Sequence, residues 1–113
     1  MSADGGTGLV VLLTTAPNPE VAERLGETLV AERLAACANL VPGVQSIFRW
    51  QGVLSRETEV LIVLKSTRDR LERLRARLVE LHPYEVPEVV ALDVHAGHAP
   101  YLDWVRADVG SPP

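Results

Sequence analysis

Two long alternating stretches joined by a tight turn constrain the fold of this chain more than any other feature. In the first stretch apolar and polar side chains alternate, so that Phe48 and Trp50 fall on one face of an extended strand. Gln51 and Gly52 supply the turn chemistry, after which the alternation resumes through residues 58–64. The pattern predicts a β-hairpin whose strands run to about ten residues each, longer than a small four-stranded core covers.

Hydrophobic periodicity predicts the other elements. An aliphatic run that closes on two threonines indicates a strand buried on both faces at residues 9–15. Asn18, as an N-cap followed by Pro19, begins a helix that we expect to end at Arg33. The remaining predictions are a bend at Pro42 and Gly43 inside the first hairpin strand, a helix capped by Ser66 or Thr67 with buried leucines at 71, 74, 78 and 81, a strand at residues 86–94, and a short helix at residues 101–107.

The order of these elements predicts an α+β fold. Right-handed crossovers and short connections resolve βαββαβ into a ferredoxin-like sandwich with both helices on one face of the sheet, a long central hairpin and a short C-terminal helix. We expect one domain at residues 9–109, flanked by flexible tails at residues 1–8 and 110–113. An isolated two-stranded ribbon would be marginally stable and prone to aggregate. Pairing of the hairpin with other subunits removes those open edges, so we expect a closed homo-oligomer.

Residues 82–88, His-Pro-Tyr-Glu-Val-Pro-Glu, are the leading candidate for a functional segment. The two prolines disfavour helix at the residues before them, which predicts a stiff connection from a helix into a strand. His82 is the first candidate metal ligand, and its alternative role is a helix C-terminal residue bonded to a carbonyl group. Glu88 is the second candidate, and its alternatives are exposure to solvent or pairing with Lys65 or an arginine. The sequence leaves these alternatives open.

Cys37 is the only cysteine, which excludes an internal disulfide and fits a reducing, cytoplasmic compartment. Its neighbours are alanines, so core packing is its ordinary role, and it would serve as a soft copper ligand only if it faced a cleft. His95 and His98 have a spacing that a metal could use, but they lie in a loop without a third ligand nearby in the sequence.

Composition excludes several classes of function. A net charge of −4 and a pI near 5.3 argue against nucleic-acid binding. No apolar run reaches the roughly 18 residues of a membrane span. The arginines between residues 68 and 77 alternate with acidic residues, as is typical of the solvated face of a helix. No hydrolytic triad or recognisable acid–base pair is present, so we do not expect an enzyme.

Several residue blocks extend over almost the whole chain in a characteristic order. They are Leu34-Ala35-Ala36-Cys37 with Asn39, Pro42 with Ser46, Trp50 with Gly52, Glu59, Lys65, His82-Pro83-Tyr84, Pro87-Glu88, and Tyr101-Leu102 with Trp104. In this order they resemble the CutA divalent-cation tolerance family. The resemblance implies a ferredoxin-like subunit, a very stable homotrimer, a cytoplasmic location, and an association with copper and other divalent metals. It implies no established enzymatic reaction.

The chain departs from the family pattern at a few positions. Val53 stands where relatives commonly have lysine, and Phe48 where they have tyrosine. Thr14 and Thr15 occupy a region where some relatives place a cysteine, so a copper site that depended on that thiolate would be incomplete in this chain.

The sequence thus predicts a trimeric protein of divalent-metal tolerance. We expect His82 and Glu88 to offer nitrogen and oxygen ligands to copper(II) or another divalent cation, in a cleft between subunits. One alternative is a signalling or small-ligand module like the trimeric PII proteins, which normally needs a long mobile loop where this chain has a tight turn. Another is a stable scaffold with incidental metal binding. The sequence identifies no protein partner.

Overall fold

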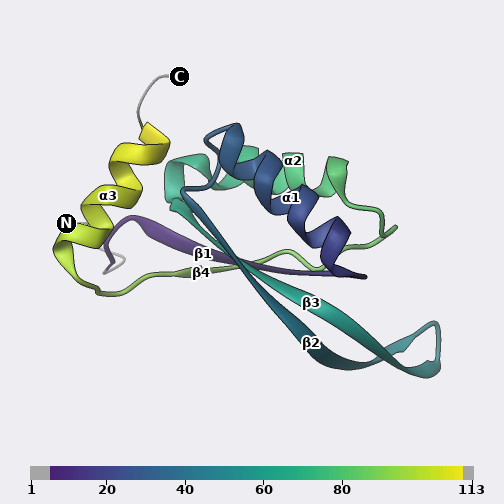
Figure 1. The fold of residues 1–113 in the computed structure, drawn as a ribbon. Helices are drawn as coiled ribbons and strands as arrows, with labels where there is room; N and C mark the ends of the chain where they lie inside the picture. The colour runs from purple at the N-terminus through teal and green to yellow at the C-terminus, as the bar shows by residue number, and fades with distance from the viewer. Residues whose placement is uncertain (1–5, 111–113) are drawn as a thin grey trace.

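The fold is a four-stranded antiparallel sheet with two helices on one face. The computed structural model describes residues 6–110. The elements in chain order are β1 (Leu9–Ala16), α1 (Pro19–Ala31), β2 (Cys37–Trp50), β3 (Val53–Thr67), the 3₁₀ turn η1 (Arg68–Arg70), α2 (Leu71–Leu81), β4 (Val90–Asp93) and α3 (Ala99–Gly110). The strands lie in the order β2-β3-β1-β4. Figure 1 shows α1 and α2 together on one face and α3 at the end of the sheet away from the hairpin tip. The predicted α+β fold is confirmed.

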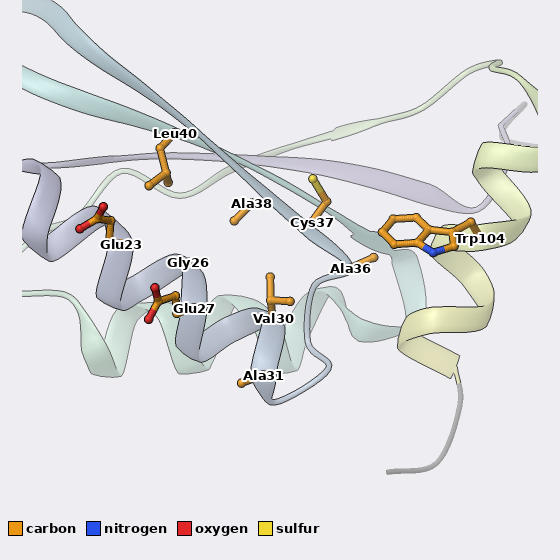
Figure 2. Close-up of a pocket in the computed structure, with 10 residues that line it drawn as sticks. All are labelled: Glu23, Gly26, Glu27, Val30, Ala31, Ala36, Cys37, Ala38, Leu40 and Trp104. Atoms are coloured by element: carbon orange, nitrogen blue, oxygen red, sulfur yellow. The ribbon is translucent and has the colours of Figure 1, made fainter.

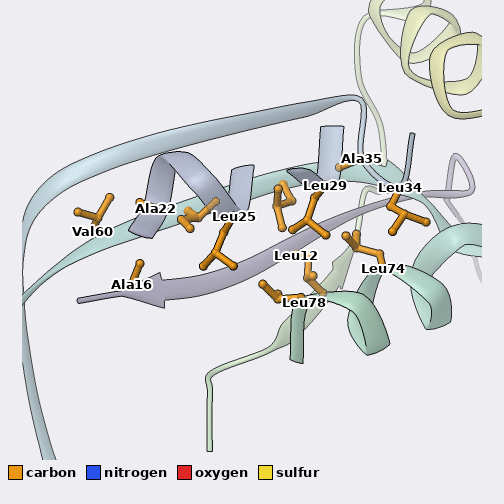
Figure 3. Close-up of a cluster of buried hydrophobic side chains, with 12 residues drawn as sticks. Leu12, Ala16, Ala22, Leu25, Leu29, Leu34, Ala35, Val60, Leu74 and Leu78 are labelled. Carbon is orange, nitrogen blue, oxygen red and sulfur yellow. The ribbon is translucent and has the colours of Figure 1, made fainter. Parts of the chain in front are cut away.

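The main core lies between the sheet and the two covering helices (Figure 3). Helix α1 begins as predicted, because the Asn18 side chain accepts a hydrogen bond of 2.9 Å from the backbone N–H of Val21. Aliphatic side chains from β1, both helices and β3 then meet at close to zero exposure. The largest of them are Leu12, Leu25, Leu29, Ile62, Leu64, Leu74 and Leu78. Burial of this size supports a stable subunit core without a disulfide.

The hairpin of β2 and β3 extends well beyond the rest of the sheet (Figure 1). Strand β1 pairs with β3 only as far as the pair of Ala16 and Val60. Residues 44–50 and 53–59 therefore form a two-stranded ribbon, which we call the arm. The register shifts between Val41 and Val44, so the predicted bend within β2 is confirmed as a bulge. At the arm's tip Gln51 and Gly52 have φ angles of 50° and 82°, which both central residues of a type I′ turn require.

Two predicted element boundaries and one predicted helix cap were wrong. Strand β4 covers only Val90–Asp93 instead of residues 86–94, because Pro87 cannot donate to a ladder and residues 83–86 form bends. Helix α2 has no side-chain cap: Thr67 makes no cap hydrogen bond, and Ser66 donates instead to the carbonyl of Leu34 at 2.6 Å. Helix α3 extends to Gly110, because Val109 joins the buried side chains that hold this helix.

The ordered domain also extends into both predicted tails. The backbone N–H of Thr7 donates to the carbonyl of Val94 at 3.1 Å, and the Thr7 hydroxyl donates to the same oxygen at 2.9 Å. Gly110 is the last residue of α3. The rest of the predicted tails, residues 1–5 and 111–113, lies outside the described residues. No helix within residues 6–110 is long and apolar enough to cross a membrane.

Candidate functional site

A hollow of about 530 Å³ lies where the arm leaves the sheet. We call it the arm-base hollow. Its walls come from the arm, from the end of β1 and from the connection between α2 and β4: Pro17, Phe48, Trp50, Glu57, Glu59, Pro83, Tyr84, Glu85 and Val86. Most of the predicted functional segment, residues 82–88, therefore faces the hairpin, because the bends after α2 carry the chain across the end of β1.

His82 does not line the hollow, but its side chain holds the connection between α2 and β4 in place. Its side chain is buried, and its Nε2 lies 2.7 Å from the carbonyl oxygen of Thr15. Its Nδ1 accepts a hydrogen bond of 3.1 Å from the backbone N–H of Tyr84. Because a carbonyl only accepts and an amide N–H only donates, the proton of the neutral imidazole belongs on Nε2. Both ring nitrogens are thus engaged within the chain, and the imidazole anchors Tyr84.

Tyr84 connects this segment to the hairpin. Its ring packs on that of His82 with centroids 4.7 Å apart, and its hydroxyl donates to Oε2 of Glu59 at 2.5 Å. Burial raises the pKa of Tyr84 far above its usual range, and the hydrogen bond to Glu59 and the charges of Glu59 and Glu57 raise it further. The phenol therefore stays protonated and remains a donor to Glu59 throughout the physiological pH range.

Three carboxylates give the arm-base hollow a negative charge. Glu59 is only 8% exposed, and its Oε2 accepts the hydrogen bond from Tyr84. Glu57 and Glu85 are exposed on the same walls. Within residues 6–110 none of the three forms a salt bridge. Negative charge gathered on these walls makes this hollow a place where a cation would be stabilised.

The arginines of α2 behave as predicted for a solvated helix face. Arg75 pairs with Glu72 at 2.8 Å, and Arg77 pairs with both Glu32 and Glu80. These pairs are partly exposed, and none of their residues lines the hollow, so they leave its carboxylates uncompensated.

The structure places the two predicted ligands differently. His82 is buried with both nitrogens bonded, so it would have to release one bond to coordinate a metal. Glu88 is exposed beyond the hollow and forms no salt bridge with the described residues. Lys65, proposed as its alternative partner, donates instead to Asn39. The described residues contain no group of three or more His, Cys, Asp or Glu side chains that could hold a metal ion. The paired site thus stays a prediction.

Cys37 occupies a second hollow, of about 660 Å³, between α1, the start of β2 and Trp104 of α3 (Figure 2). The prediction that this thiol packs inside the core was wrong for the single chain, because Cys37 is only partly buried. It begins an edge strand, so no neighbouring strand covers one side of it. Its Sγ contacts Oδ1 of Asn39 at 3.6 Å. His95 and His98 are exposed in the loop before α3.

Sequence reasoning missed Glu57 and Glu59 as parts of a site. They lie on β3, 25 or more residues before Tyr84, and only the fold brings the Tyr84 hydroxyl to Glu59. One signal was available: Glu57 and Glu59 alternate with Thr58 in a strand, so both carboxylates project from the same face.

Comparisons with known proteins agree with one another. The family model of the CutA1 divalent ion tolerance proteins matches residues 10–108. The divalent-cation tolerance protein CutA of Thermus thermophilus is 48% identical over 100 residues, which cover 88% of this chain and 97% of that protein.

Two solved structures extend this likeness to the fold. The crystal structure of CutA from Xylella fastidiosa superposes with a TM-score of 0.89 at 34% identity, over 91% of this chain and 99% of that one. The structure described as the periplasmic divalent cation tolerance protein CutA from Archaeoglobus fulgidus gives a TM-score of 0.86 at 31% identity, over 89% and 98% of the two chains. This chain belongs to the CutA1 divalent ion tolerance protein family.

Proposed function

We propose that this protein binds a divalent cation, with copper(II) foremost, as a cytoplasmic homotrimer whose metal sites lie between subunits. Membership of a divalent-cation tolerance family supports a role in metal tolerance. One observation carries the proposed position of the site: Glu88 is exposed and forms no ion pair with any residue from 6 to 110, two residues before β4, an edge strand whose Val90 and Leu92 are about half exposed. A neighbouring subunit that covers this edge would meet the carboxylate.

The ligand set needs such a neighbour. No group of three ligating side chains is present within the described part of one chain, and a strong divalent site needs several donors. His82 is the nitrogen donor available near Glu88, provided that it gives up the bond to Thr15 or to Tyr84. Copper(II) should bind more tightly than the other divalent first-row metals, because nitrogen and oxygen ligands generally favour it.

Calorimetric titration of metal-free protein with copper(II), zinc and magnesium tests this proposal. Glu88→Gln should weaken copper binding about ten-fold or more, whereas Glu27→Gln, an exposed carboxylate on α1, should leave it unchanged. His82→Ala should weaken it as well, in samples whose near-UV circular dichroism shows the native fold. Identical copper affinity for wild type and Glu88→Gln would eliminate this site and favour a scaffold role.

The alternative of a PII-like signalling module lacks a specific supporting observation. That class needs a long mobile loop between the middle strands, and here the connection between β2 and β3 is the two-residue turn of Gln51 and Gly52.

A further inference from the structure

His82 has one ring nitrogen whose lone pair can be offered to a metal ion. Its Nε2 carries the proton of the neutral imidazole and lies 2.7 Å from the Thr15 carbonyl oxygen. The lone pair is therefore on Nδ1, where it accepts the backbone N–H of Tyr84 at 3.1 Å. Because a metal ion coordinates a lone pair and not an N–H group, Nδ1 is the nitrogen that this tautomer makes available.

The Thr15 carbonyl gives His82 the support that metal-binding histidines have. Such histidines almost always donate their second ring N–H to a carboxylate, a backbone carbonyl or a water, and this bond fixes the tautomer and the orientation of the ring. In this chain the bond is already formed by a side chain that is only 7% exposed, and the ring of Tyr84 packs against it. The donor chemistry of His82 therefore fits a divalent metal, apart from the N–H that occupies Nδ1.

The Tyr84 N–H belongs to a segment that can rearrange locally. Residues 83–86 form bends outside the sheet. Pro83 is exposed and Tyr84 is only partly buried, so an amide released from Nδ1 can bond to water instead. The Tyr84 hydroxyl has its own partner in Glu59, which keeps the side chain attached. Rotation of the peptide between Pro83 and Tyr84 thus frees the lone pair without unfolding the connection.

We propose that the hydrogen bond from the Tyr84 N–H to Nδ1 of His82 is a latch that must be open when His82 serves as a metal ligand. One lone pair serves one partner at a time, so the latched and ligating states exclude each other. Because only open molecules bind, the latch lowers the apparent metal affinity in proportion to their fraction. This inference rests on the proposed function and adds to it the ligating atom and the bond that is exchanged.

Nuclear magnetic resonance on isotope-labelled wild-type protein tests the latch, with zinc as a diamagnetic probe. Saturating zinc should shift the Nδ1 signal of His82, leave the proton on Nε2, and speed hydrogen exchange of the Tyr84 amide about ten-fold or more. The Val21 amide, which is bonded to the side chain of Asn18, should keep its rate. A zinc-dependent His82 signal with an unchanged Tyr84 exchange rate, or with loss of the Nε2 proton, would overturn the proposal.

A pair of variants isolates the N–H. Tyr84→Ala removes the ring and keeps the amide N–H, whereas Tyr84→Pro removes both. In folded samples, calorimetric titration should show copper(II) binding at least about five-fold tighter for Tyr84→Pro than for Tyr84→Ala. Equal affinities of the two folded variants would refute the latch. If Tyr84→Pro does not fold, exchange of the Tyr84 amide in the wild-type protein decides.

His82→Ala separates the latch from the proposed function. If folded His82→Ala binds copper more weakly than the wild type while the exchange rate of Tyr84 ignores zinc, His82 is a ligand without a latch, and only the latch is refuted. If His82→Ala binds copper as tightly as the wild type, both the proposed ligand and its latch are refuted.

Discussion

At the scale of single residues, Tyr84 has the most strongly perturbed environment near the candidate site. Its pKa is raised by burial first, and then by the hydrogen bond and negative charge of Glu59. The pKa of Tyr101 is raised as well, chiefly by burial. A tyrosine in an unfolded chain has a pKa near 10. Tyrosinate absorbance at 295 nm should therefore remain low at pH 10 in the folded protein, and a signal of one half-ionised residue or more there would contradict this environment.

The raised pKa values of Tyr84 and Tyr101 also determine how the stability of the folded protein changes at alkaline pH. Because the folded pKa of each tyrosine lies above the unfolded value, its contribution to stability is fully present below about pH 10 and is lost as the pH rises toward the folded pKa. Denaturant midpoints should hence fall above pH 10. Tyr84→Phe should reduce this fall, while Glu59→Gln should reduce it less, since burial, the largest cause, remains.

His82 should be structurally important whatever its role with metals. His82→Ala leaves the Thr15 carbonyl and the Tyr84 N–H without their partners and opens a buried space, so we expect a loss of about 2–4 kcal/mol in the free energy of unfolding. His98→Ala, at an exposed loop position, should change it by less than about 0.5 kcal/mol. Guanidinium denaturation at one fixed protein concentration compares the two. Similar midpoints for both variants would mean that the imidazole is not buried as described.

The sequence could place His82 at a helix end but could not identify its contacts. Pro83 marks the helix end locally, whereas the Thr15 carbonyl lies 67 positions away and becomes a neighbour only when β1 and the connection after α2 meet. The contact of Glu59 was equally hidden from the sequence, because its partner Tyr84 lies 25 positions later. Local chemistry was predictable, and the pairing of distant groups was not.

At the scale of elements, the turn of the arm depends on Gly52. A residue with a Cβ at its φ of 82° is strained, so Gly52→Ala should lower the free energy of unfolding by about 1–2 kcal/mol. Gly110→Ala provides a matched control, since Gly110 lies in α3 with open space at its Cβ position and no left-handed φ. Thermal unfolding of both variants measures the difference. Equal effects would show that the turn tolerates a side chain.

Element types were easier to predict than element ends. The β2–β3 hairpin was recognisable because alternation and turn chemistry agree. Strand β4 was overestimated because Val86 and Val89 continue its apolar pattern, but residue 86 lies in the bend and residues 86–89 have no ladder partner. The predicted cap of α2 was wrong because the buried Ser66 hydroxyl donates to the Leu34 carbonyl. It therefore makes no bond to the start of the helix.

At the scale of the whole molecule, the arm is the feature that a single chain leaves unsatisfied. Large apolar side chains along it are open to solvent: Ile47, Phe48, Trp50, Val53 and Leu54 are between 39% and 72% exposed. The sheet also has two open edges, β2 and β4. Exposed apolar ribbon and open strand edges favour assembly, in agreement with the homotrimer that we propose.

A charge at the arm should therefore disrupt the assembly. Wild-type protein should have a solution mass of about three times 12.3 kDa in size-exclusion chromatography coupled to light scattering. Leu54→Asp, at a position 72% exposed in the single chain, should lower that mass, because an unpaired carboxylate buried at an interface costs several kcal/mol. Val79→Asp makes the same kind of change on the exposed face of α2 and should preserve the trimer. A wild-type monomer at micromolar concentration would remove the case for assembly, and equal masses for wild type and Leu54→Asp would place the interface away from the arm's tip.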